Sequence, residues 1–284
     1  MKRTSLLHLS LFSLAMTYPA MALGHSQNSA STAPVSASTQ ASASTESTAE
    51  DYLGLKLSVG QKFGNIFSKT VSYQGGGIDE DAGHVGGSEL YQVVDASPEH
   101  PIFLGSYRYD GRGGNSGTSE IRNTGQTVCS VKSGKCTQYL DDSGSIFDAF
   151  LWGKPTGKIA PGMTWKVEMA VPWELGPPGI ETVTVIRVDP INHEVMLKRE
   201  GSGEGFFAGD NKQITVKRGG KEYSVDVTPG TTHWVGYTVF REGLTVSDEL
   251  LETRTLIVSS KDFGTSTINE RQFTLLNQTP PDLL

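Results

Sequence analysis

The sequence predicts an all-β protein, built as an antiparallel meander that forms a curved sheet or a partly open barrel. Short runs rich in β-branched and aromatic residues follow one another from Tyr52 to Leu276. Turn residues separate these runs, without the alternating helices that a parallel sheet requires. No repeat of fixed period is visible, which argues against a propeller or a solenoid. We therefore expect residues 51–284 to form a single β-rich domain.

The chain begins with an export signal, predicted over residues 1–22. Lys2 and Arg3 form a positive start, a short apolar run follows, and Ala20-Met21-Ala22 supplies a small-x-small cleavage site. Residues 23–50 are predicted to be a disordered linker, because eight Ser, four Thr and six Ala in His25–Glu50 leave almost nothing to bury. We expect a soluble periplasmic or extracellular protein with no transmembrane segment in its mature form.

The first half of the folded part carries glycine-rich strands. They are expected at Ile66–Tyr73, Glu89–Val94, Ile102–Tyr109, Glu120–Arg122 and Thr127–Val131. Between the first two lies Gly75–His84, in which Asp79 and Asp81 begin a calcium-type pattern that no later residue completes. This segment is therefore interpreted as a solvated loop, and no metal site is predicted.

The cysteines are Cys129 and Cys136, on either side of a turn-rich segment. Cross-strand partners in a hairpin bring their Cα atoms close enough to bridge, and an exported chain meets oxidising conditions. A structural disulfide is predicted. Six residues separate the pair, whereas a redox motif normally has two.

One short helix is expected near residues 145–152. Ser145-Ile146-Phe147-Asp148 fits a capping box, and Gly153 and Pro155 end the apolar pattern. Ser247–Glu252 is a candidate for a second short helical turn.

The second half carries the clearest strand signals. Tyr223, Val225 and Val227 alternate with polar residues, which indicates one buried and one solvated face. Arg218-Gly219-Gly220-Lys221 predicts a hairpin, and Thr228-Pro229-Gly230 predicts a turn. The strands expected here are Glu181–Val188, Glu194–Arg199, Gln213–Lys217, Lys221–Val227, His233–Phe240, Thr253–Ser259 and Arg271–Leu276.

The charge of the chain argues against nucleic acid as a partner. The formal net charge is -7, and removing Lys2 and Arg3 with the signal makes it -9. No basic stripe with interleaved aromatic residues occurs. No nucleophile, nucleotide or cofactor motif is recognised either, so no catalytic residue and no cofactor are predicted.

Aromatic residues supply the candidate ligand contacts. Trp152, Trp165 and Trp173 lie close together in the sequence, and aromatic faces can stack on sugar rings or line an apolar pocket. Glu174, beside Trp173, is the fourth candidate ligand contact. Core packing is the alternative for each tryptophan. Trp173 is the one most expected at the surface, because Glu174 and a Gly-Pro-Pro-Gly turn follow it.

Two classes of function remain open. The leading hypothesis is an exported, non-catalytic binding or cell-envelope protein that holds an apolar or amphipathic ligand, such as a lipid, on the curved sheet. In architecture alone, a long meander with one interposed helix resembles the half-barrels of periplasmic lipid and lipoprotein carriers. The alternative is a carbohydrate-active enzyme, or a carbohydrate-binding or adhesion module, that uses the Trp152–Glu181 region. Its candidate carboxylates are Glu168, Glu174 and Glu181.

Overall fold

The described part of the chain folds into antiparallel β-strands that all belong to one sheet. The computed structural model describes residues 52–97, 101–110, 114–122, 125–129, 136–140, 153, 155–170, 172–173, 175–207 and 210–284. Thirteen strands lie in these ranges, together with one turn of 3-10 helix, η2 (Pro281–Leu283). The predicted all-β class is confirmed. The predicted signal, linker and helix near residues 145–152 lie outside the described residues.

The strands differ widely in length, and the longest belong to the second half of the chain. They are β1 (Lys62–Gln74), β2 (Asp81–Asp95), β3 (Ile102–Tyr109), β4 (Gly114–Arg122), β5 (Gly125–Cys129), β6 (Cys136–Leu140), β7 (Thr164–Met169), β8 (Gly179–Asp189), β9 (Glu194–Glu204), β10 (Gln213–Arg218), β11 (Lys221–Arg241), β12 (Leu244–Ser260) and β13 (Gly264–Thr279).

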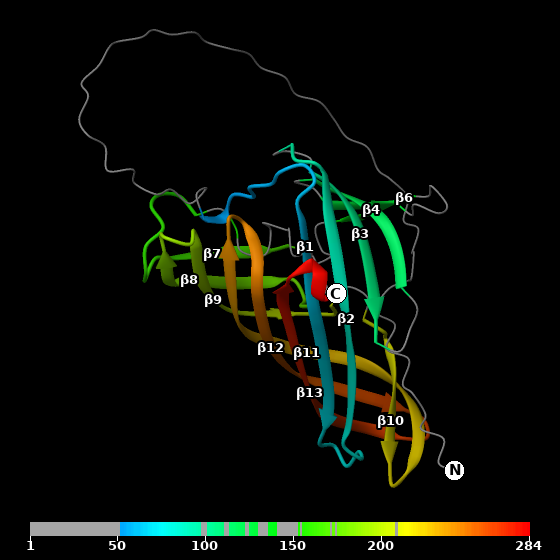
Figure 1. The fold of residues 1–284 in the computed structure, drawn as a ribbon. Helices are drawn as coiled ribbons and strands as arrows, with labels where there is room; N and C mark the ends of the chain where they lie inside the picture. The colour runs from blue at the N-terminus through cyan, green and yellow to red at the C-terminus, as the bar shows by residue number, and fades with distance from the viewer. Residues whose placement is uncertain are drawn as a thin grey trace, which may run out of the picture.

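Two meanders meet in the middle of the sheet. The strand order is β6-β5-β4-β3-β2-β1-β13-β12-β11-β9-β8-β7, so the first and last strands are neighbours and β6 and β7 lie at opposite ends of this order. The β1–β13 pairing runs from Gly64 opposite Thr279 to Gln74 opposite Asn269. Figure 1 shows the sheet curving without closing on itself. The pairing of β1 with β13 therefore joins the two halves of the chain.

Strand β11 is continuous where the sequence predicted two strands and a turn. Residues 221–226 pair with β10, and residues 231–241 pair with β9. The register with β12 shifts between Pro229 and Thr232, where the change of partner occurs. Proline has no N–H to donate to a ladder, so it is tolerated at such an irregularity. The predicted turn at Thr228-Pro229-Gly230 is wrong, because the chain bends there without reversing.

The hairpin predicted at Arg218-Gly219-Gly220-Lys221 is confirmed. Arg218 lies opposite Lys221 in the β10–β11 ladder, and the two glycines have φ of 59° and 77°. Such angles are readily available only to glycine, so this turn requires both residues.

The second helical turn, considered at Ser247–Glu252, is wrong. These residues lie inside β12 and pair with both β11 and β13. Ser-Asp-Glu-Leu-Leu-Glu suits the start of a helix locally. Two long neighbouring strands nevertheless override that local preference, because each residue of Ser247–Glu252 gains ladder partners on both sides.

The prediction of a solvated loop over Gly75–His84 is wrong for residues 81–84, which belong to β2 and pair with β1. The remaining connection, residues 75–80, is tied to two other turns. The Asp79 carboxylate accepts hydrogen bonds from the backbone N–H groups of Gly219 and Gly220 at 2.9 Å and 2.7 Å. Arg218 donates to the Gly76 carbonyl at 2.9 Å and lies over the Phe263 ring, 3.8 Å from its centroid. These contacts hold the β1–β2, β10–β11 and β12–β13 connections together, and we call them the clasp. The two hydrogen bonds lower the pKa of Asp79.

The predicted cysteine hairpin is present in the backbone. Cys129 and Cys136 are directly opposite each other where β5 and β6 pair. Facing residues of an antiparallel pair are close enough for a disulfide. The disulfide itself remains a prediction that this register supports.

Apolar side chains form three clusters on the sheet. The first joins β7, β8, β9 and β11 and contains Leu250, and the second joins β10, β11, β12 and β13 and contains Leu256. The third surrounds Phe63, Val93 and Phe103. Among the described residues, no helix has the length and apolar character needed to cross a membrane.

Candidate functional site

The predicted tryptophan site is resolved only in part. Trp152 and Glu174 lie outside the described residues, and Trp165 is half-buried on β7. Trp173 is 0% exposed and packs edge-on against Trp234, with ring centroids 6.1 Å apart. The expectation that Trp173 lies at the surface is therefore wrong, although ligand contact by the other tryptophans stays a prediction.

The turn that suggested exposure is what buries Trp173. The backbone N–H of Trp173 donates to the Gly176 carbonyl at 2.9 Å, so the chain folds back on itself. A Cβ at position 176 would lie 2.4 Å from the indole nitrogen. Glycine at this position therefore leaves the space that the indole occupies.

Two carboxylates of the enzyme hypothesis, Glu168 and Glu181, are separated by the sheet. Glu168 is exposed, whereas the neighbouring residue Val167 lies opposite Glu181, which is 0% exposed. Successive side chains of a strand point to opposite faces, so Glu168 and Glu181 lie on different sides of the sheet. These two groups cannot flank one glycosidic bond.

A different set of polar residues gathers on the buried face of the sheet, which we call the inner face. Along β12, Leu250, Glu252, Arg254, Leu256 and Val258 are buried, and the residues between them are more exposed. We call the charged and amide side chains at the middle of this face the polar band. Its members are Glu181, Arg199, Glu252, Arg254, Glu270 and Gln272.

Arg199 forms the centre of the first ion-pair group. Its Nε lies 3.1 Å from Glu181 Oε1, and its Nη1 lies 3.4 Å from Asp248 Oδ1. The Trp234 indole donates to the other Glu181 oxygen at 2.8 Å. Burial raises the pKa of Glu181, while the contacting guanidinium and the indole N–H oppose that rise. The ion pair is fully enclosed, with both side chains at 1% exposure or less.

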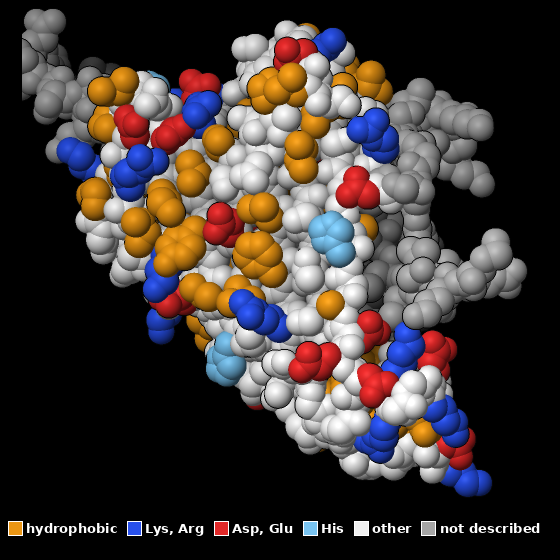
Figure 2. Space-filling model, turned by 60° about the horizontal axis from the view of Figure 1, so that its bottom comes forward, with side chains coloured by type: hydrophobic (Ala, Val, Ile, Leu, Met, Phe, Trp, Pro, Cys, Tyr) orange, Lys and Arg blue, Asp and Glu red, His pale blue; other side chains and the backbone are white. Residues whose placement is uncertain are grey.

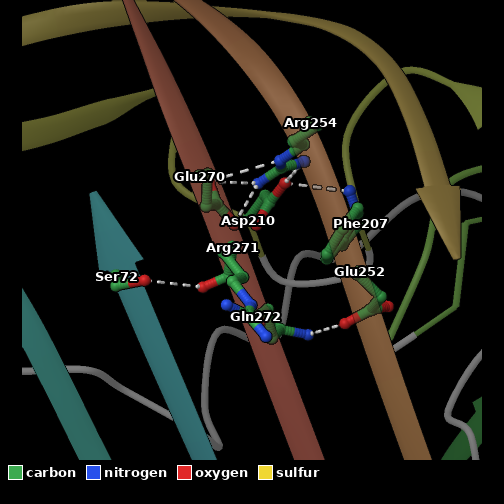
Figure 3. A network of polar contacts seen from close by, with 8 residues as sticks. All are labelled: Ser72, Phe207, Asp210, Glu252, Arg254, Glu270, Arg271 and Gln272. Carbon is green, nitrogen blue, oxygen red and sulfur yellow. Dashed lines mark hydrogen bonds and ion pairs between the residues drawn. The ribbon is translucent and has the colours of Figure 1, made fainter. Parts of the chain in front are cut away.

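Arg254 forms a second group of the same composition. Its Nη2 lies 3.1 Å from Glu270 Oε2, and its Nη1 lies 2.8 Å from Asp210 Oδ2. Its guanidinium also lies over the Phe207 ring, 3.9 Å from the centroid. Figure 3 shows Asp210 and Glu270 converging on Arg254. Each of the two arginines thus contacts two carboxylates.

Glu252 lies between the two groups and differs from the other acids. It is opposite Gln272 in the β12–β13 ladder and accepts a hydrogen bond from the Gln272 amide (Figure 3). Burial raises its pKa well above the ordinary value, with a further contribution from Glu270, although Lys69 and Arg254 oppose the rise. Burial therefore disfavours the charged form of the Glu252 carboxyl.

Within the described ranges, several buried polar atoms of this region have no hydrogen-bond partner. They are Arg199 Nη2, Glu252 Oε1, Thr232 Oγ1 and Thr274 Oγ1. The register places them together in rows of residues that face one another across the strands. Thr274 and Arg199 share the row of Leu250, because Leu250 is opposite Thr274 and Gly236, and Gly236 is opposite Arg199. Glu252 lies in the next row, and Thr232 lies opposite Arg254 in the row after that. They therefore occupy three successive rows of the inner face. Buried polar atoms are nearly always paired, so such a group of unpaired ones is unusual.

The other surface of the molecule has a different character. Exposed apolar side chains include Ile180, Tyr237, Ile257 and Phe273, at 38% to 55% exposure. Figure 2 shows a face on which apolar side chains gather, with acidic and basic ones interspersed among them. Within the described ranges, no group of three or more His, Cys, Asp or Glu side chains is arranged to hold a metal ion.

Neither a scan against models of protein families nor a search of curated proteins finds a match to this chain. The polar band is therefore the feature from which a function can be inferred. The local sequence does not reveal this band, because Ser247–Glu252 resembles a helical turn. Leu250, Glu252, Arg254 and Leu256 occupy alternate positions of one strand and therefore share a face. This alternation is the sequence signal from which the polar band could have been predicted.

Proposed function

We propose that this chain is an exported, non-catalytic binding protein that holds an amphipathic ligand on the inner face of its curved sheet. In this proposal the polar group of the ligand meets the polar band, and its apolar part lies along the adjoining clusters. The observation that carries the proposal is the group of unpaired buried polar atoms around Glu252. Export rests on the signal predicted over residues 1–22.

The energetics of the unpaired groups favour a ligand. A buried polar group without a partner costs about 1–3 kcal/mol, and four such groups lie within three rows of one face. A ligand that pairs with them recovers part of that cost on binding. The polar band therefore supplies a driving force for association that a fully paired interior would not.

The surroundings of the polar band suit a ligand with an apolar part. On the inner face of β12, Leu250 belongs to the first apolar cluster and Leu256 to the second, with Glu252 and Arg254 between them. Burial of apolar surface contributes about 25 cal/mol per Å². An amphipathic molecule can contact both environments at once, whereas a purely apolar ligand would leave the polar band unpaired.

The test is to analyse what the protein carries when it is purified from its natural host. Organic extraction followed by mass spectrometry should release an amphiphile in a fixed ratio to protein. Its removal should lower the melting temperature, and adding it back should restore the value, because a ligand stabilises the state that binds it.

Two matched variants locate the binding surface. Glu252→Gln keeps the shape of the side chain but changes the group at the unpaired position, and it should reduce the amount of ligand retained. Glu249→Gln removes an exposed acid from the opposite face of the same strand and should leave retention unchanged. Equal retention by both variants, or an extract without any amphiphile, would contradict the proposal.

A further inference from the structure

We infer that the polar group held by the polar band is uncharged and rich in hydroxyls, as in a sugar or a similar polyol. This inference rests on the proposed function and deepens it, because it names the chemical class of the bound group. It is argued from the charges that face the site, from the donor and acceptor character of the unpaired atoms, and from their spread across the sheet.

The charges facing the site leave nothing to attract an anion. Arg199 contacts Glu181 and Asp248, and Arg254 contacts Glu270 and Asp210, so each guanidinium is outnumbered two to one. Lys69, opposite Thr274 in the β1–β13 ladder, is the third cation whose charge acts on Glu252. Three cations thus face four carboxylates, not counting Glu252. A phosphate or carboxylate would enter a region of slight negative excess.

The unpaired atoms also argue against an amine as the main bound group. Arg199 Nη2 only donates hydrogen bonds, so it needs an acceptor, which an ammonium group lacks. Thr232 and Thr274 offer hydroxyls that both donate and accept. Burial raises the pKa of Glu252 and so disfavours the charged form that would attract an ammonium ion. Hydroxyl groups can pair with every one of these atoms.

The spread of the unpaired atoms requires more than one hydroxyl. They come from β9, β11, β12 and β13, which are adjacent strands in the sheet. The guanidinium of Arg199 reaches Thr238 on β11 and Asp248 on β12, so the unpaired atoms lie over β11, β12 and β13. Two intervals between neighbouring strands correspond to about 10 Å at the backbone. A single alcohol group cannot reach across that span, whereas the several hydroxyls of a sugar ring or a short glycan can.

The test compares head groups on one alkyl chain. Protein freed of bound ligand by extraction is titrated calorimetrically with dodecyl maltoside, dodecylphosphocholine and laurate, each below its micelle threshold, and with maltose. We expect dodecyl maltoside to bind at least about tenfold tighter than the two charged amphiphiles, which corresponds to about 1.4 kcal/mol.

Two threonine variants connect that preference to the site. Thr232→Val and Thr274→Val remove an unpaired hydroxyl while keeping the shape of the side chain. Each should weaken dodecyl maltoside binding several-fold, yet leave the melting temperature of the ligand-free protein unchanged or raised, because an unpaired buried hydroxyl is removed. A hydroxyl with a purely structural role would lower it. Thr253→Val, at an exposed position on β12, is the control and should change neither quantity.

The possible results separate the inference from the proposed function. Equal affinity for the three dodecyl probes would overturn the hydroxyl inference and leave amphiphile binding intact. Binding of maltose as tightly as dodecyl maltoside would support the hydroxyl inference and contradict the role of the apolar part. Failure of every probe to bind would overturn both. The comparison of probes on the unaltered protein decides the matter even where a threonine variant does not fold.

Discussion

Replacing Arg199 by methionine tests whether the buried ion pair is needed to keep Glu181 in the interior. The change leaves a carboxylate with 0% exposure beside an apolar side chain, although Trp234 still donates to it. Removing one partner of a buried ion pair typically costs about 3–5 kcal/mol. Glu181 can escape its unpaired charge by taking up a proton. Because the ordinary pKa of this carboxyl is 4.5, protonating it at pH 7 costs about 3.4 kcal/mol.

The same reasoning fixes how the loss of stability depends on pH. Removing Arg199 raises the folded-state pKa of Glu181 further above its unfolded value. Relative to the wild type, this penalty is therefore absent below the folded-state pKa of Glu181, which burial already holds above 4.5, and it grows by about 1.4 kcal/mol per pH unit above it. Urea unfolding followed by tryptophan fluorescence should show a loss of about 3–5 kcal/mol for Arg199→Met near pH 7, shrinking to less than about 1 kcal/mol near pH 5.

Two further variants keep this prediction specific. Arg241→Met breaks an ion pair with Glu194 in which the arginine is 50% exposed, and it should cost less than about 1 kcal/mol. The double change Arg199→Met with Glu181→Gln removes the carboxylate as well and should recover much of the lost stability. A loss below about 1 kcal/mol near pH 7 for Arg199→Met alone, or a loss that does not change with pH, would refute the reasoning.

Three other predictions concern the clasp, the cysteines and the signal. Asp79→Asn should lower the melting temperature at neutral pH, because the stabilisation requires the ionised carboxylate. The difference from the wild type should vanish as the pH falls below 3.8, the ordinary pKa of the group, and through its lowered folded-state pKa. Reduction of the predicted Cys129–Cys136 disulfide should destabilise the protein by roughly 2–2.5 kcal/mol, measured by urea unfolding with and without reductant; thiols that titrate before reduction would contradict the bridge. Sequencing of the mature protein should find Leu23 near its start, and an intact Met1 would contradict export.

The sequence predicted well wherever a local signal had one meaning. Alternating residues such as Tyr223, Val225 and Val227 predicted strand, and Gly219-Gly220 predicted the hairpin that the structure contains. These inferences succeed because side-chain alternation and positive φ are properties of a few adjacent residues. The all-β class follows from many such signals, and no single error among them changes it.

The errors fall where distant parts of the chain decide the outcome. Ser247–Glu252 resembles a helical turn until β11 and β13 pair with it on both sides. Trp173 resembles a surface residue until Gly176 folds the backbone over and the indole packs against Trp234, 61 positions further along the chain. In both cases the contacts that decide the structure are absent from the local sequence.

Composition, turns and alternation were enough to determine the antiparallel β class and to predict the compartment. The tertiary structure decided that β1 and β13 meet in the middle of the sheet, and it thereby set Lys69 opposite Thr274. It also brought Arg199 to Glu181 and Arg254 to Glu270, so that the polar band exists only in the folded chain. The physical reason is that strand propensity acts within a few residues. The site, in contrast, is formed by register between strands, which is established only when the whole sheet pairs.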